Sequence, residues 1–129
     1  MADDRPPDDA PVIRVIAMPH DTNPAGDIFG GWLMSWMDLA AGTIAARRAH
    51  GRAATVACEA LAFLSPVVVG DEVSFYGDLI SEGRSSMRIH VEAWRRARES
   101  EETRKVTEAT FTYVAIGVDR RPRALPSKT

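Results

Sequence analysis

The sequence predicts an α+β fold in which an antiparallel β-sheet wraps around one long central α-helix. Two observations lead to this prediction: an apolar segment with helical spacing near the N-terminus, and strand-like segments that fill the rest of the chain. Consecutive strands joined by turns form an antiparallel sheet, which is expected to curl around the single early helix. With 129 residues, the chain is expected to form one domain.

The elements are predicted in a simple order along the chain. A β-branched strand (12–18) is followed by a loop rich in Pro, Asn, Asp and Gly. The helix is expected from about Gly31 to Ala49, with arginines in its last turn and Gly51 just beyond. Its apolar residues fall on nearly all sides, so burial on several faces is expected. Four more strands are predicted, at 53–64, 72–81, 85–97 and 104–118.

Both ends of the chain are expected to lie outside the domain, which leaves 12–119 as its extent. Residues 1–11 are acidic and proline-rich, as in a disordered tail, and they lack the apolar segment of a signal peptide. Residues 120–129 are predicted to form an irregular tail. The net charge of -2 gives no reason to expect nucleic acid, and no apolar run is long enough to span a membrane. We therefore expect a cytoplasmic protein.

Residue spacing argues against several kinds of chemistry. The three histidines, His20, His50 and His90, are far apart, and no His or Cys pair has zinc-like spacing, so neither a metal nor another cofactor is expected. A nucleophile elbow, a P-loop and a dinucleotide-binding glycine pattern are also absent from the sequence. The single cysteine, Cys58, lies in an apolar segment and is expected to be a buried structural thiol.

One carboxylate interrupts the apolar helix. Asp38 lies about two turns into the helix, where it forms a narrow stripe with Ser35 and Gly42. Gly42 itself costs roughly 1 kcal/mol of helix stability relative to alanine. An ionised carboxylate among apolar residues has to be paired, hydrogen-bonded, protonated or next to a wet cleft. Two interpretations of Asp38 remain open: a salt bridge to an arginine elsewhere, or a general base or nucleophile.

The loop before the helix contains three more candidates. Gly30 and Gly31 fall at the helix start, where unpaired N–H groups can hold an anion or a developing oxyanion. Alternatively, these glycines only allow the turn. Asn23 either makes the local hydrogen bonds of a turn or takes part in catalysis. Outside the loop, Glu59 and Glu108 interrupt strands and are expected to be paired on a face of the sheet.

Five segments resemble those of a known family. They are "MPHDTNPAGDIFGGWLMSWMD", "FLSPVVVGD", "GRSSMRIHVEAW", "TEATFTYVAI" and "RPRALP". In this order, over about residues 12–126, they resemble the YciA-like acyl-CoA thioesterases of the hotdog fold. The resemblance implies a sheet wrapped around a central helix, and hydrolysis of acyl-CoA to free acid and CoA without a metal.

The resemblance also implies roles for the candidate residues. Asp38 matches the catalytic carboxylate that activates water or attacks directly, Asn23 orients the water or the carbonyl, and Gly30 and Gly31 polarise the carbonyl. Two protomers of the family pair side by side, so Asn23 and Asp38 of one site are expected from different chains. Such dimers often assemble into hexamers.

Coenzyme A carries phosphates, so basic residues are expected near the entrance of the site. The candidates are Arg84 with the hydroxyls of Ser85 and Ser86, and Arg121 and Arg123 in the tail; solvated surface arginines are the alternative. Three other functions remain open: a non-catalytic acyl-CoA-binding protein, a hydroxyacyl thioester dehydratase that uses a histidine, and a structural oligomer. The presence of both Asp38 and Asn23 favours the thioesterase.

Overall fold

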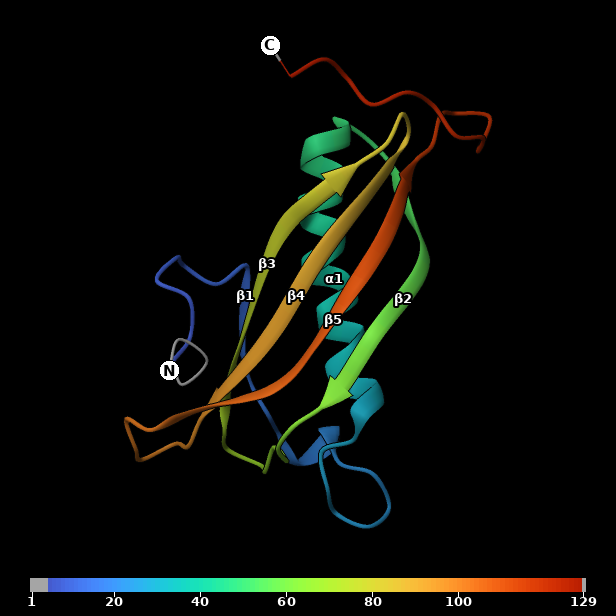
Figure 1. Cartoon of the computed structure of the whole chain (residues 1–129). Helices are drawn as coiled ribbons and strands as arrows, with labels where there is room; N and C mark the ends of the chain where they lie inside the picture. The colour runs from blue at the N-terminus through green and yellow to red at the C-terminus, as the bar shows by residue number, and fades with distance from the viewer. Residues whose placement is uncertain (1–4, 129) are drawn as a thin grey trace.

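The computed structural model describes residues 5–128 and contains a five-stranded antiparallel sheet packed against a long helix (Figure 1). The elements are β1 (Ile13–Ile16), the short 3-10 helix η2 (Pro19–Asp21), α1 (Gly30–Ala49), β2 (Ala53–Phe63), β3 (Glu72–Glu82), β4 (Ser86–Arg96) and β5 (Thr103–Ala115). The predicted α+β fold with one central helix is confirmed. Of the helices in the described part, none has both the length and the hydropathy of a membrane-spanning segment.

The ends of the elements differ from the prediction by a few residues. The last strand was expected to reach 118, but β5 ends at Ala115 because the chain then turns back and Ile116 pairs with Pro122. The helix ends at Ala49, and the C-cap residue His50, with a left-handed φ of 51°, takes the place expected of Gly51. Part of the predicted N-terminal tail, residues 1–4, lies outside the described residues; 5–11 contain no helix or strand.

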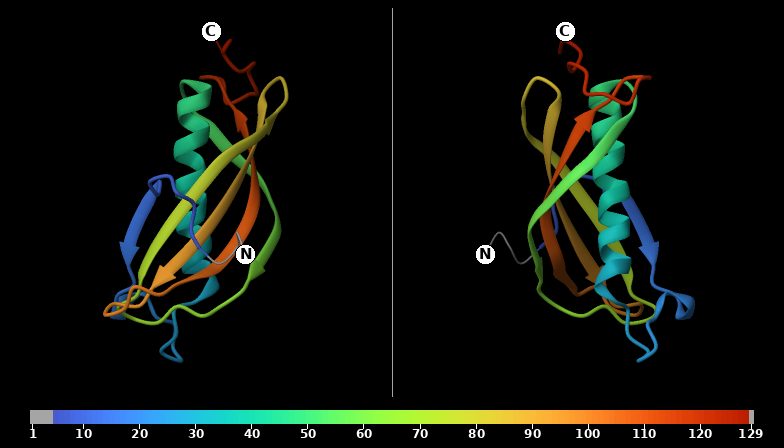
Figure 2. Two further views of the ribbon diagram at one scale, coloured as in Figure 1. Left: turned by 60° about the vertical axis from the view of Figure 1, so that its left-hand side comes forward. Right: turned by 90° about the vertical axis from the view of Figure 1, so that its right-hand side faces the viewer.

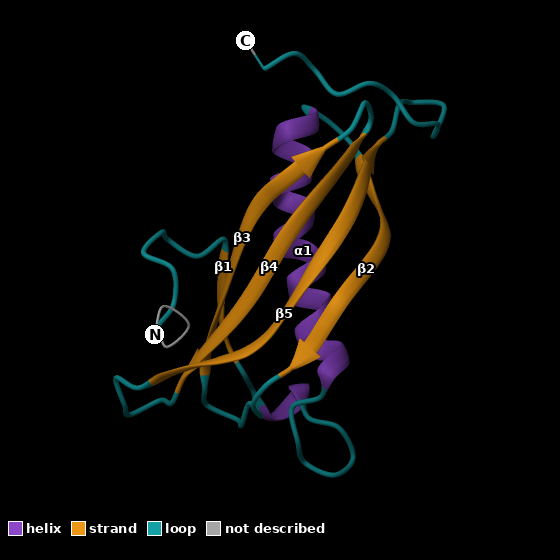
Figure 3. Cartoon of the chain, viewed as in Figure 1, coloured by secondary structure: helices purple, strands orange, loops and turns teal. Residues whose placement is uncertain are grey.

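The sheet has the strand order β1-β3-β4-β5-β2, so β1 and β2 are its edges (Figure 3). In β4, alternate residues are apolar and buried on the side of α1. These residues are Met87, Ile89, Val91 and Ala93. Figure 2 shows α1 lying along one face of the twisted sheet, where its own buried residues complete the core.

The exposure of side chains on the edge strand β2 and on α1 corrects two predictions. Cys58 is exposed and not buried, because it lies on this edge strand and no other segment among residues 5–128 covers it. On α1, Leu39 has 57% of its surface exposed, so the helix is not buried on all the faces that its apolar sequence suggested. Val56 and Phe63 of β2 are similarly exposed, at 57% and 54%. The helix α1 and the edge strand β2 therefore both carry exposed apolar side chains, and we call this part of the surface the open face of α1 and β2.

Candidate active site

Asp38 lies in the middle of α1 and is hydrogen-bonded from the sheet. Its carboxylate oxygen Oδ1 accepts a hydrogen bond from Thr55 Oγ1 of β2 at 2.7 Å, and a second one from the hydroxyl of Tyr113 in β5. The predicted alternative of a salt bridge to arginine is wrong, because both partners are neutral O–H donors. A carboxylate whose hydrogen-bond donors are neutral hydroxyls is not tied up in an ion pair and is available for chemistry.

The two carboxylate oxygens of Asp38 have different surroundings. Both side-chain donors reach Oδ1, whereas Oδ2 accepts no hydrogen bond from any described residue. A carboxylate oxygen has lone pairs that can accept a proton from water. The arrangement therefore presents one oxygen that is held by the protein and one that is available to a ligand or a water molecule.

Tyr113 is the residue of this site that sequence reasoning missed. It is the direct cross-strand neighbour of Thr55 in the β2–β5 pairing, so the two hydroxyls approach the helix together. Tyr113 is 3% exposed, and burial, reinforced by the hydrogen bond to Asp38, raises the pKa of its phenol above the ordinary value. The phenol therefore keeps its proton at neutral pH and acts as a hydrogen-bond donor. The only signal in the sequence was a tyrosine on the core side of an alternating strand.

The helix start carries Gly30 and Gly31, as predicted. Phe29, at the N-cap, makes no side-chain capping bond, so the first N–H groups of α1 have no side-chain cap. A Cβ on Gly30 would lie 2.8 Å from the ring of Phe63, which shows how closely this ring covers the helix start. Along the helix axis, Gly31 and Asp38 of one chain are about 10 Å apart. They are too far apart to contact the same carbonyl group directly.

Asn23 lies in the loop before α1 and makes the local bonds of a turn. Its Oδ1 accepts hydrogen bonds from the backbone N–H groups of Ala25 and Asp27, both at 3.0 Å. This geometry corresponds to the local role that the sequence left open, and within one chain Asn23 has no hydrogen bond to Asp38. Its side-chain amide nitrogen has no hydrogen-bond partner among the described residues.

The residues predicted to bind CoA gather at the opposite end of α1. Arg84, Ser85 and Ser86 lie around the β3–β4 turn, and the tail packs against it through a hydrogen bond from Leu125 N to Arg84 O. Arg123 donates to the backbone carbonyls of Ile116 and Ala49, so its guanidinium also anchors the tail to the helix end. Arg121 is exposed.

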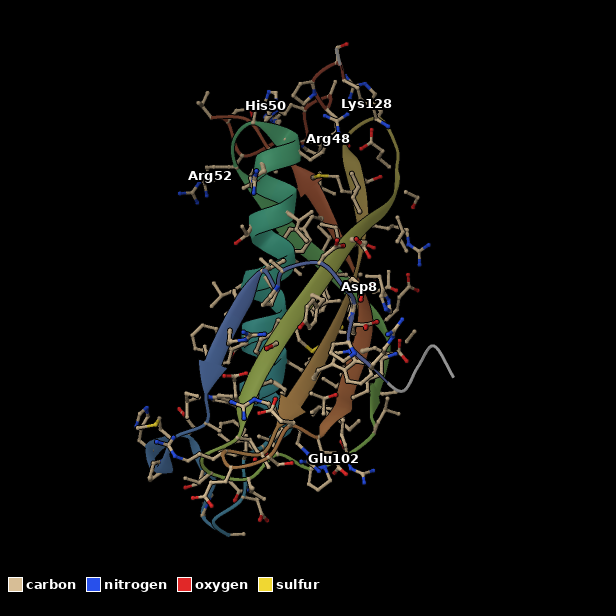
Figure 4. The ribbon with its side chains drawn as sticks, turned by 90° about the vertical axis from the view of Figure 1, so that its left-hand side faces the viewer. Asp8, Arg48, His50, Arg52, Glu102 and Lys128 are labelled. Atoms are coloured by element: carbon tan, nitrogen blue, oxygen red, sulfur yellow. The ribbon has the colours of Figure 1, made fainter. Side chains whose placement is uncertain are left out.

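Further basic side chains lie at this end of the molecule. Figure 4 shows Arg48, His50, Arg52 and Lys128 near the C-terminal end of α1, far from Glu102 in the β4–β5 turn. With its 20 residues, α1 separates this basic end from Gly30 by about 30 Å. Within one chain, the predicted CoA residues and the helix start therefore cannot belong to one site.

An apolar pocket of about 500 Å³ adjoins the helix start. It is lined by Ile28, Gly30, Leu33, Phe63, Leu64, Ser65, Pro66 and Val67. A pocket of this size and lining suits a small aliphatic group, and it lies beside the uncapped N–H groups of α1.

One group of described residues has the side-chain types of a metal site. His90, Glu92 and Glu108 come together on the outer face of the sheet through strand pairing, which counting histidine and cysteine pairs in the sequence did not reveal. The ammonium group of Lys105 lies 3.2 Å from Glu108 and 3.7 Å from Glu92, so the carboxylates already share a cation. The predicted pairing of Glu108 is confirmed, and so is that of Glu59, which pairs with Arg88 at 2.6 Å.

The histidines that a dehydratase would need are remote from Asp38. His20 pairs with Asp21 in η2, and its side chain is 78% exposed. His90 contacts Glu92 and Glu108 on the outer face of the sheet, away from α1. Within residues 5–128, no histidine is hydrogen-bonded to the Asp38 carboxylate. The geometry thus gives no support to the dehydratase alternative.

A long helix on a curled antiparallel sheet, with a carboxylate in the middle of the helix, is the arrangement expected of a hotdog-fold thioesterase, and comparisons with known proteins agree. A family model of the thioesterase superfamily matches residues 25–102. The chain is similar to the acyl-CoA thioester hydrolase YciA of Escherichia coli (strain K12), with 48% identity over 118 residues, which are 89% of each chain. An uncharacterized acyl-CoA thioester hydrolase of Zymomonas mobilis is 54% identical over 116 residues, 90% of this chain and 78% of the relative.

Solved structures agree with these relatives. A hexameric thioesterase from Yersinia pestis superimposes with a TM-score of 0.88 and 46% identity, covering 94% of this chain and 98% of that one. HI0827, described as a hexameric broad specificity acyl-coenzyme A thioesterase, gives a TM-score of 0.87 and 46% identity over 97% of this chain and 86% of that one. The chain therefore belongs to the YciA-like acyl-CoA thioesterases of the hotdog fold.

Proposed function

We propose that the protein hydrolyses acyl-CoA thioesters to a carboxylic acid and CoA, with Asp38 as the general base. The observation that carries the proposal is the Asp38 carboxylate, which two neutral donors hold at Oδ1 and whose Oδ2 accepts no hydrogen bond from residues 5–128. A pure acyl-CoA-binding protein has no need of such a carboxylate inside an apolar helix. The names of the relatives, which are acyl-CoA thioester hydrolases, support the same activity.

In the proposed reaction, Asp38 Oδ2 takes a proton from water while the water oxygen attacks the thioester carbonyl. The developing oxyanion is stabilised by the N–H groups at the start of α1, for which Gly31 is the principal candidate and Gly30 its neighbour. When the C–S bond breaks, the CoA sulfur leaves and recovers the proton from Asp38. Direct attack by Asp38 Oδ2 on the carbonyl would instead form an acyl anhydride, which water then hydrolyses; our proposal takes the route in which Asp38 activates water.

We propose that the complete site needs two protomers, paired through the open face of α1 and β2. Leu39, Val56 and Phe63 expose apolar surface there, and the outer edge of β2 has no partner strand within the described chain. The 10 Å spacing of Gly31 and Asp38 is a second reason, because a carbonyl bound at one helix start could be reached by the partner's carboxylate. Asn23 would then act with Asp38 of the other chain.

Three such dimers would form a hexamer, the state in which relatives from Yersinia pestis and others are described. In an antiparallel pair of protomers, the basic end of one chain lies near the helix start of the other. Arg84, Ser85, Ser86, Arg121 and Arg123 are therefore proposed to meet the phosphates of a CoA whose thioester lies at the partner's helix start. The cytoplasm remains the expected location, and no cofactor is proposed, since CoA enters as part of the substrate.

The proposed function is tested with a panel of acyl-CoAs of increasing chain length, with release of the free thiol as the signal. Asp38→Asn should lower turnover at least about 100-fold, because a general base contributes a factor of this order or more. Asp78→Asn changes an exposed aspartate on β3 and should leave turnover unchanged. Near-normal turnover by Asp38→Asn would exclude Asp38 as the general base. If the wild-type protein binds acyl-CoA but hydrolyses none of the panel, it is a non-catalytic acyl-CoA-binding protein.

A further inference from the structure

The hydroxyl of Tyr113 reaches two oxygens of Asp38 at once. It donates to the carboxylate oxygen Oδ1, and it lies 2.6 Å from the backbone carbonyl oxygen of the same residue. Asp38 and Tyr113 are 75 residues apart in the chain, so this contact exists only in the folded protein. The phenol thus fixes both the backbone and the side chain of one residue of α1.

The approach of Tyr113 depends on Gly42, one turn after Asp38 on the same face of the helix. A Cβ at position 42 would lie 3.4 Å from the Tyr113 hydroxyl oxygen and 3.6 Å from its ring. A side chain larger than alanine would therefore occupy the space that the hydroxyl needs. Glycine in a helix costs about 1 kcal/mol relative to alanine, and the room for Tyr113 gives this unfavourable residue a structural reason.

The chemistry of the contact has a definite direction. The phenol is buried and its pKa is raised, mainly by burial and then by the hydrogen bond to Asp38, so at neutral pH the phenol is the donor. A hydrogen bond donated to a carboxylate favours its charged form. A second donor, Thr55, reaches the same oxygen, so together the two residues restrict rotation of the carboxylate.

We propose that Tyr113 is a positioning residue for the reaction: its hydroxyl, seated in the space left by Gly42, holds Oδ1 of Asp38 and thereby presents Oδ2 to the attacking water. The inference rests on the proposed function, in which Asp38 is the base. Tyr113 itself touches neither the water nor the thioester in this proposal.

The main test is Tyr113→Phe, which keeps the ring in the core and removes only the hydroxyl. We expect kcat to fall about tenfold, the rate equivalent of one hydrogen bond to a charged group, with little change in KM. The loss should be confined to kcat, because Tyr113 touches no part of the bound substrate in this proposal. The control is Tyr76→Phe, which removes the hydroxyl of another buried tyrosine, on β3, and should change neither quantity.

Wild-type kcat in Tyr113→Phe would overturn the proposal, as would equal losses in the two phenylalanine variants. Asp38→Asn is measured in parallel to separate the two claims. If Asp38→Asn is inactive while Tyr113→Phe equals the wild type, only the role of Tyr113 fails. If Asp38→Asn is active, the role of Asp38 as the general base fails, and the role of Tyr113 fails with it.

A spectroscopic measurement tests the contact without activity. The chain has two tyrosines, so in Tyr76→Phe the only phenol is that of Tyr113. Its ionisation, followed by ultraviolet absorbance, should occur at higher pH than in a free tyrosine, and adding Asp38→Asn should bring the ionisation to lower pH. An ionisation that does not respond to Asp38→Asn would show that the two groups are not coupled and would contradict the proposal.

Discussion

Thr55 Oγ1, on the edge strand β2, donates a hydrogen bond of 2.7 Å to the Asp38 carboxylate on α1. This bond connects the open strand of the sheet to the middle of the helix. Together with the hydrogen bond from Tyr113, it holds the carboxylate oxygen Oδ1 in place. The same strand exposes Val56 next to Thr55, so the proposed interface and the proposed base lie side by side.

Replacing Thr55 should therefore reduce activity through Asp38. Thr55→Val keeps the shape of the side chain but removes the hydroxyl, and we expect kcat to fall about tenfold. Thr55→Ser retains a hydroxyl and should keep most of the activity. Steady-state kinetics with one acyl-CoA decides the matter: equal rates for the valine variant and the wild type would show that this hydrogen bond does not serve the reaction.

Arg84→Ala should weaken recognition of the nucleotide part of CoA. We expect KM for acyl-CoA to rise about fivefold, equivalent to roughly 1 kcal/mol for an exposed charged contact, with kcat unchanged. The measurement compares acyl-CoA with the matching acyl-pantetheine, which lacks the nucleotide and should show no change. Arg98→Ala, which alters an exposed arginine between β4 and β5, is the control. An equal rise in KM for acyl-CoA and acyl-pantetheine would count against phosphate recognition by Arg84.

Val56→Lys should disturb the proposed pairing of protomers. The side chain is 57% exposed in the single chain, and a lysine there would have to be desolvated in an apolar interface. We expect smaller species in size-exclusion chromatography with light scattering. We also expect the activity per protomer to fall when the protein is diluted. Val118→Lys changes a fully exposed valine in the C-terminal turn and should leave the assembly intact. An unchanged mass for Val56→Lys would contradict an interface on β2.

The ion pair of Arg48 and Glu82 should make the stability of the fold depend on pH in the acidic range. Arg48 Nε and Nη2 donate to the two carboxylate oxygens of Glu82, both at 2.8 Å, and this pairing lowers the pKa of Glu82 from 4.5. Because the pKa of Glu82 is lowered in the folded state, the ion pair stabilises the fold above about pH 4.5. This stabilisation is lost as the pH falls through the folded-state pKa of Glu82.

Thermal unfolding of Glu82→Gln checks this expectation. The midpoint should lie below that of the wild type at pH 7, and the two midpoints should converge as the pH falls well below 4.5. Glu102→Gln, in the exposed β4–β5 turn, should show a much smaller difference at pH 7. A difference for Glu82→Gln that persisted unchanged into acid would indicate a cause other than its charge.

The sequence by itself determined the fold class, the order of the elements and the position of Asp38. Apolar spacing distinguishes a helix from a strand because each element repeats its buried face with its own period, and these periods are local properties of the chain. The same local logic identified a carboxylate out of place in an apolar helix. It also located Gly30 and Gly31 at the helix start, since turn residues and the first apolar residues are neighbours in sequence.

Only the tertiary structure decided what surrounds these residues. The partners of Asp38 are 17 and 75 residues away, and strand pairing brings them together in a register that no local pattern specifies. The exposure of Cys58 has the same origin, because the sequence shows that β2 is apolar but not that it is an edge strand. The length of α1 likewise separates the basic end from the helix start. Contacts between distant segments depend on how the whole chain packs, and therefore the site became visible only in the fold.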